Sequence, residues 1–202
     1  MSAKFLNISV NVPLVLVLSI IPDVDIIFQE VFPFIRHRGA THSIIFAFLI
    51  FIPFFALYHK KAIPYFLAFL SHFLIADYII GGRIQLFWPL TFQHYGFEIS
   101  IRSLTNVMLE WMLLLVAIFI MFRANDIATF FKPSKSNLLL IIPLPTLLLP
   151  VLLTLPVPPF LGLTLDIPVM LILPHLILAF LLLAAIFTGL LDFFKKCACM
   201  LT

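Results

Sequence analysis

The chain has 202 residues, of which 63% are hydrophobic and only 10% are charged, and its formal net charge is +3. A soluble domain usually carries about 25% charged residues, so this composition excludes an ordinary soluble fold and predicts an integral membrane protein. The small positive charge comes from loop lysines and indicates no nucleic-acid partner, so the lipid bilayer is the expected partner.

Six apolar blocks follow one another along the chain. Each comes close to the 17 to 20 residues, roughly, that a helix needs to cross the hydrocarbon. Lipid-exposed loops are not tolerated there, so the blocks predict an all-α bundle of about six transmembrane helices. They are Phe5–Ile21, His42–Tyr58, Ala62–Ile80, Val107–Phe122, Leu138–Leu155 and Ile167–Leu190.

The two halves of the chain differ in character. Residues 1–110 contain several short polar clusters, and we expect this half to carry the chemistry. Residues 111–202 are rich in proline, which kinks membrane helices, and we expect them to form a scaffold within one membrane domain.

Lysine and arginine in the loops predict the orientation in the membrane. With six crossings, both termini lie on the side that holds most of the basic residues. Cytoplasmic loops carry an excess of these residues, so both termini are expected in the cytoplasm. That side holds Lys4, Lys60, Lys61, Arg123, Lys132, Lys135, Lys195 and Lys196, whereas the other holds Arg36, Arg38, Arg83 and Arg102.

Three short polar segments interrupt the first half. PDVD (Pro22–Asp25) follows the first block, HRGATHS (His37–Ser43) precedes and enters the second, and SHFLIAD (Ser71–Asp77) lies toward the end of the third. With the predicted topology, all three segments meet at the outer face of the bundle. An ionisable side chain inside a membrane is costly, which makes these residues candidates for function.

Histidine nitrogen and carboxylate oxygen together suit a divalent transition metal, with zinc or manganese favoured. A sulfur-rich structural site is not expected, because no cysteine lies near. Pro22 disfavours a helix before it, so Asp23 and Asp25 are expected to alternate in an extended segment and point the same way. Gly39 permits a tight turn, and Thr41 is the expected N-cap of the second helix.

The third segment presents a geometric difficulty. His72 and Asp77 are five residues apart, which is about 140° around an ideal α-helix. Both can bind one ion only if the helix bends or if a second metal is present. His175, in LILPHLIL of the sixth block, either bonds a carbonyl freed by the Pro174 kink or supports the metal site.

PDVD, HRGATHS and SHFLIAD, followed by LFWP (Leu86–Pro89), resemble the LexA-binding, inner-membrane-associated metal-dependent hydrolases. The resemblance covers roughly Leu14 to Glu110. It implies a multi-pass inner-membrane protein. It also implies metal binding by the residues that match the family's motif positions, which are Asp23, Asp25, His37, His42, His72 and Asp77.

These features together predict a metal-dependent hydrolase acting on a lipid or other amphiphilic ester, with a phosphoester favoured, at the outer membrane face. Glu110 is the candidate general base, because burial can raise the pKa of a carboxylate toward neutrality. Arg38, with Arg36 and Arg83, is expected to hold an anionic group of the substrate.

Two other classes of function stay open. Intramembrane histidine and aspartate could form a proton or metal-ion pathway, although the inner halves of the helices are apolar. A non-catalytic membrane partner protein is the third reading. Ile26 and Ile80, which depart from the family pattern, suit that reading.

Overall fold

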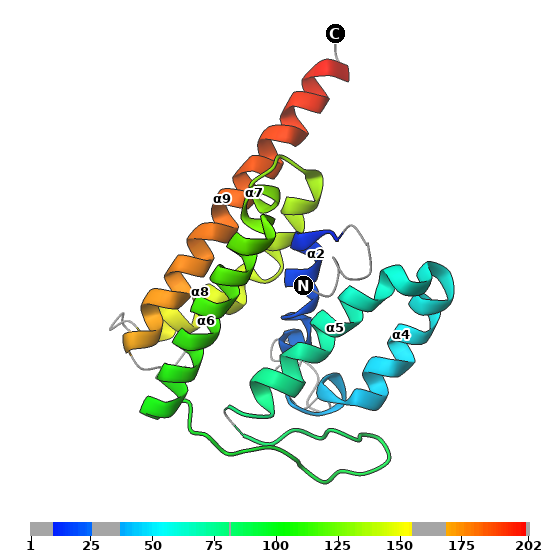
Figure 1. Cartoon of the computed structure of the whole chain (residues 1–202), viewed down its shortest axis with the longest axis vertical. Helices are drawn as coiled ribbons and strands as arrows, with labels where there is room; N and C mark the ends of the chain where they lie inside the picture. Colours follow the sequence, from blue (N-terminus) through cyan, green and yellow to red (C-terminus); the bar gives the residue numbers. More distant parts are fainter. Residues whose placement is uncertain (1–9, 26–36, 81, 155–168, 201–202) are drawn as a thin grey trace. The chain divides into compact units, whose positions relative to one another are not determined.

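The computed structural model describes residues 10–25, 37–80, 82–154 and 169–200 (Figure 1). Helices make up 74% of the structure, and the described residues form isolated β-bridges but no strand. The chain divides into two compact units. The first contains Leu18–Ser100, and the second contains Asn11–Val17 and Ile101–Thr202.

A helical hairpin forms most of the first unit. Helix α4 (Ile44–Tyr58) ends at His59, which has a φ of 51°, and a 3-10 turn η3 (His59–Ala62) reverses the chain. Helix α5 (Ile63–Ser71) then runs back beside α4 (Figure 1). Phe66 of α5 stacks on Phe51 of α4 with a centroid distance of 4.1 Å, so aromatic packing holds the hairpin closed.

Helix α5 continues into a π-helical segment, η4 (His72–Asp77). The amide of Tyr78 donates to the carbonyl of Phe73 at 3.0 Å, which is the i→i+5 bond that defines a π-helix. Phe73 is fully buried and packs with Ala47 and Ile84 in the core of this unit. The π-helical segment is therefore anchored by the same core that joins the hairpin to the following loop.

Two short 3-10 helices precede the hairpin, η1 (Ile21–Val24) and η2 (Ala40–His42). The extended conformation expected around Asp23 is wrong, because Pro22 stands in the first turn of η1, where its fixed φ favours a helical start. The N-cap of α4 is Ser43 rather than Thr41. The Ser43 side chain accepts from the amides of Ile45 and Phe46, since η2 holds Thr41 one turn earlier.

The second unit is built around a long helix, α9 (Val169–Met200). Its core contains Phe130, Leu140, Leu182, Ala185 and Ile186. The elements of this unit are α2 (Val12–Leu18, whose last residue is in the first unit), α6 (Leu104–Ala124), α7 (Asp126–Phe130), the 3-10 helix η5 (Lys135–Ile141), α8 (Leu144–Thr154) and α9.

A proline lies inside α9 and is compensated from α6. Pro174 has no amide hydrogen, so it cannot donate to the carbonyl of Met170 one turn earlier. The indole Nε1 of Trp111 donates to that carbonyl at 3.1 Å. A neighbouring helix thus supplies the donor that the kink removes, as membrane helices require.

Three helical stretches of the described chain are long and apolar enough to cross a membrane: Ile44–Asp77, Leu104–Ala124 and Val169–Ala198. The first contains the reversal at His59, so it consists of two shorter helices, of which α4 is about 22 Å long. The all-helical membrane character is confirmed, whereas the expected number of six transmembrane helices is not.

Candidate metal centre

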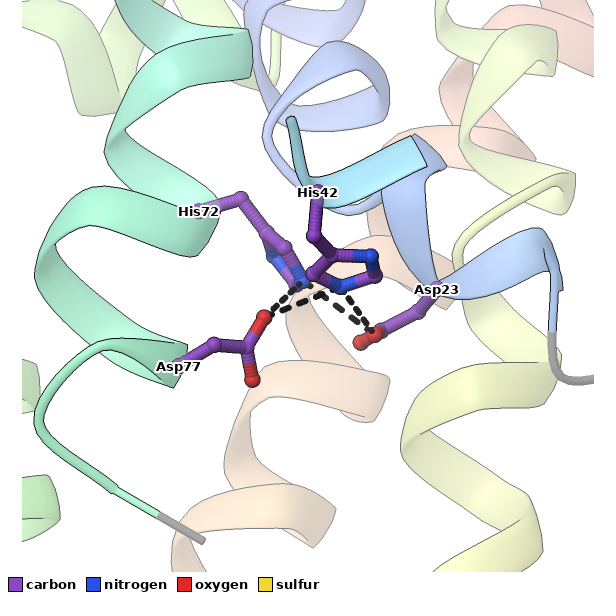
Figure 2. Close-up of side chains that lie close together, drawn as sticks. All are labelled: Asp23, His42, His72 and Asp77. Atoms are coloured by element: carbon purple, nitrogen blue, oxygen red, sulfur yellow. Dashed lines mark ion pairs between the residues drawn. The ribbon is translucent and has the colours of Figure 1, made fainter. Parts of the chain in front are cut away.

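Four side chains from three separate parts of the sequence meet in the first unit (Figure 2). Asp23 comes from η1, His42 from η2, and His72 and Asp77 from η4. One nitrogen or oxygen atom of each lies within 4.8 Å of the corresponding atom of every other. Four of the six predicted ligands therefore surround one point.

The distances between these atoms are short and similar. Asp77 Oδ2 lies 3.0 Å from His42 Nε2 and 3.1 Å from His72 Nε2. Asp23 Oδ1 lies 3.2 Å from His72 Nε2 and 3.7 Å from His42 Nε2. Zinc bonds of about 2.0–2.2 Å in a tetrahedron put neighbouring ligand atoms about 3.3–3.6 Å apart, so the spacing fits a shared ion.

The π-helix resolves the difficulty posed by the spacing of His72 and Asp77. In a π-helix the backbone bonds join residues five apart, so such residues lie on one side of the segment. An ideal α-helix would separate them by about 140°. A local change from α-helix to π-helix therefore brings these two residues together.

Three of the facing atoms make no hydrogen bond within the described structure. In the described part of the chain, His42 Nε2, His72 Nε2 and Asp77 Oδ2 are buried and have no hydrogen-bond partner, despite their closeness. Buried polar atoms without partners are costly, and an ion among them would satisfy all three.

The backbone fixes the tautomer of His72. Its Nδ1 lies 2.8 Å from the carbonyl oxygen of Ser19, which can only accept a hydrogen bond. Nδ1 therefore carries the hydrogen, and in the neutral ring the lone pair is on Nε2, facing the other three side chains. Metal-binding histidines are oriented by this kind of bond.

Asp25 and His37, the other two predicted ligands, lie on the opposite side of the His42 ring. Asp25 Oδ1 is 2.8 Å from His37 Nδ1, and Oδ2 accepts from the Thr41 hydroxyl. Thr41 Oγ1 is in turn 2.9 Å from His42 Nδ1. Asp25, His37 and His42 form a second close group that could also hold an ion, and hydrogen bonds through Asp25 and Thr41 join its members.

Asp23 and Asp25 thus lie near different nitrogens of the His42 imidazole. Asp23 is near Nε2, and Asp25 is near Nδ1. The turn between His37 and His42 uses a left-handed residue at Arg38, which has a φ of 64°. Gly39, where the tight turn was expected, has a φ of −93°. A left-handed arginine at this position could not be predicted, because Gly39 beside it is the residue that favours a positive φ.

Arg38 reaches the centre through Asp77. Its Nη2 donates to Asp77 Oδ1 at 3.3 Å and to the Ile80 carbonyl at 3.5 Å. Gly82 leaves room for this side chain, because a Cβ there would lie 2.7 Å from Arg38 Nη1. One oxygen of Asp77 is thereby occupied, and the other faces His42 and His72.

Three carboxylates give the site a strong preference for positive charge. Burial alone would lower the pKa of His42, but Asp23, Asp25 and Asp77 outweigh it and raise the pKa to about 10. Burial would raise the pKa of Asp23, yet the two histidines hold it down at about 2, and the pKa of Asp25 is lowered by His37, His42 and Thr41. The field that holds protons here would also attract a divalent cation.

The remaining candidates have other partners or are outside the described residues. Glu110, in α6 of the second unit, accepts from Asn106 Nδ2 at 2.8 Å and belongs to neither close group. Arg83 pairs with Glu98 at 3.1 Å on the surface, and Arg36 is outside the described residues. His175 Nδ1 lies 2.7 Å from the Leu171 carbonyl in its own helix, whereas the carbonyl that Pro174 frees is that of Met170.

Sequence reasoning missed two partners of the histidines. The Ser19 carbonyl carries no signal, because any residue supplies a carbonyl there. Thr41 lies within the quoted motif and was expected to act as a cap; its position next to His42 is the one signal that could have identified its role.

The chain matches a known protein family. A family model described as YdjM inner membrane protein matches residues 2–154, which is more than half of the chain and includes the whole cluster. No curated protein and no solved structure matches the chain.

Proposed function

The chain belongs to the YdjM inner membrane protein family, and we propose that it is a metal-dependent hydrolase embedded in the inner membrane. The observation that carries the proposal is the close group of Asp23, His42, His72 and Asp77, in which three of the facing atoms are buried and make no hydrogen bond to the described residues.

Asp23, His42, His72 and Asp77 would hold the ion. Two imidazoles with two carboxylates and no thiolate suit zinc or manganese. The Asp23 side chain is 27% exposed and that of His42 is fully buried, so water and substrate would enter on the Asp23 side. When bound, the ion would lower the pKa of a water molecule and polarise the scissile group.

The surrounding residues would hold the ligands in place. Thr41 and Asp25 fix the orientation of His42 through Nδ1, and Ser19 fixes His72. Arg38 is a positioning residue in this proposal, since its guanidinium is engaged with Asp77. His37, held by Asp25 at Nδ1 and 26% exposed, is placed to carry a proton between the site and water.

A lipid or other amphiphilic ester, with a phosphoester favoured, is the proposed substrate class. The topology expected from the basic residues would put the site near the outer headgroups, with both termini in the cytoplasm. The body of α4 contains no ionisable residue between Ile44 and Tyr58 except the terminal tyrosine, which supports a one-sided site over an ion pathway.

The test is hydrolysis by the purified full-length chain in liposomes. Phosphoester and carboxylic-ester amphiphiles would be supplied with zinc or manganese, and product release would be compared with and without a chelator. We expect metal-dependent turnover that His72→Gln abolishes and that His59→Asn, a change at an exposed histidine of the turn η3, preserves.

Two results would overturn the proposal. Metal binding without turnover of any ester would favour the non-catalytic partner protein. Metal or proton flux across the same liposomes, lost in His72→Gln, would favour a transporter.

A further inference from the structure

We infer that the loop formed by residues 84–97 inserts its apolar side chains into the lipid layer at the end of the α4–α5 hairpin where α4 begins. This inference concerns a membrane-contacting surface and is independent of catalysis. An inserted loop would also bring amphiphilic substrates beside the metal centre. Only this consequence rests on the proposed function.

Hydrogen bonds attach the loop to the segment that carries His42. The amide of Gln85 donates to the carbonyl of Arg38 at 3.0 Å, and the amide of Ile44 donates to the carbonyl of Leu86 at the same distance. The Ser43 hydroxyl donates to the carbonyl of Trp88 at 2.6 Å. The loop is thus fixed to the first residues of α4 (Figure 1).

The side chains of the loop are apolar and exposed. Leu90 is 82% exposed, Phe92 69% and Phe97 63%, and Phe87 is exposed as well. Soluble surfaces rarely gather such side chains within so short a segment. Helix α4 also exposes apolar side chains, among them Phe48, Leu49 and Ile52, in a protein whose family is an inner-membrane one.

Charge is excluded from the loop and placed at its two ends. Residues 84–97 contain no aspartate, glutamate, lysine or arginine. Arg83 and Glu98, which flank the loop directly, pair with each other at 3.1 Å and are both exposed. This arrangement suits a segment that enters the headgroup region, with the ion pair remaining at the level of water.

The loop backbone is largely satisfied by the protein. Ile84 and Tyr95 exchange two hydrogen bonds of 2.9 Å, and the amides of Trp88 and Leu90 donate to carbonyls within the loop. The amide of Phe97 donates to the carbonyl of Tyr78 at 2.7 Å. Unpaired backbone groups are costly near hydrocarbon, so this internal pairing makes shallow insertion feasible.

Spin labelling of the full-length chain in liposomes of zwitterionic and anionic phospholipid tests the inference. In a Cys197→Ser, Cys199→Ser background, single cysteines would replace Leu90 or Phe92 and be labelled with a nitroxide. Ile52, on the exposed surface of α4, is the lipid reference. Lys60, in the exposed turn η3, is the water reference.

At positions 90 and 92 we expect collision with oxygen to exceed collision with a nickel chelate, with a ratio close to that at Ile52 and well above that at Lys60. A ratio equal to that at Lys60 would place the loop in water and overturn the inference. Immobile labels shielded from both reagents would indicate a protein partner and would overturn it equally.

A second readout separates this inference from the proposed hydrolysis. Leu90→Gln with Phe92→Gln should leave metal content unchanged and reduce turnover of an amphiphilic ester without reducing turnover of a short-chain, water-soluble ester. If neither ester is hydrolysed by the unmodified protein, the proposed function fails while the labelling result still decides where the loop lies.

Discussion

His72 and Asp77 are five residues apart in the chain, yet His72 Nε2 lies 3.1 Å from Asp77 Oδ2. The π-helical segment η4 produces this contact, because its i→i+5 bonds align residues at that spacing. π-Helical turns occur frequently at functional sites, and here the turn supplies half of the candidate ligands.

The register of this segment can be tested by moving the carboxylate. In an α-helix, residues 72 and 76 would share a face. We therefore expect Ala76→Asp combined with Asp77→Ala to lower metal affinity by more than the roughly 10- to 100-fold typical of losing an outer partner. Ala76→Asp alone should retain the metal. Wild-type affinity in the double variant, measured by titration calorimetry, would show that the π-helical register is unnecessary.

Asp25 and Asp23 should behave differently although they are two residues apart. Asp25 contacts His42 on the Nδ1 side, so Asp25→Asn should weaken metal binding by about 10- to 100-fold while leaving the stoichiometry at saturation unchanged. Asp23→Asn should cost more, since it alters an atom that faces the centre. A lower stoichiometry in Asp25→Asn would instead identify Asp25 as a direct ligand.

The sequence predicted which residues form the candidate site better than it predicted how those residues are arranged. The three motifs and their convergence followed from the order of the apolar blocks, and the family resemblance pointed to the same residues. The change to a π-helix at His72 could not be predicted, because it depends on packing of Phe73 and on a bond from His72 to Ser19, 53 residues away. The helix propensity of a short segment does not reflect contacts with residues far away in the sequence.

Short-range conformations were the other source of error. Pro22 was expected to begin an extended segment, but its fixed φ suits the first turn of η1 equally well. Thr41 and Ser43 are both good N-caps, and the choice of Ser43 depends on the bond from its hydroxyl to Trp88 across the fold.

The stability of the metal-free protein should depend on pH in a defined way. The pKa of His42 rises from 6.5 to about 10 on folding, so its contribution is complete below about pH 6.5 and is lost as the pH rises through about 10. The pKa of Asp23 falls from 3.8 to about 2, so its contribution is present above about pH 4 and is lost as the pH falls toward 2.

Thermal unfolding of the chelator-treated protein in detergent checks this dependence. The unfolding temperature should fall between about pH 7 and pH 10, and His42→Gln should flatten that slope. Metal affinity should change in the opposite direction over the same range, because binding requires neutral imidazole. A flat profile in the unmodified protein would contradict the ion-pair account of His42.

The expected topology can be tested on the first unit. Lys60 lies in the turn between α4 and α5, and Glu98 lies at the end of the loop that is bound to the start of α4. In the Cys197→Ser, Cys199→Ser background, a cysteine at 98 should react with a membrane-impermeant maleimide from outside the cell. A cysteine at 60 should react only after the membrane is opened. The reverse pattern would invert the orientation.

Metal analysis of the purified protein tests the central claim most directly. The full-length chain, saturated with zinc and freed of excess, should contain about one ion per chain, and its X-ray absorption spectrum should show only nitrogen and oxygen at about 2.0–2.2 Å. His72→Gln should lose the ion, whereas His59→Asn should keep it. Equal zinc content in the His72→Gln and unmodified proteins, or a sulfur contribution to the spectrum, would contradict the account.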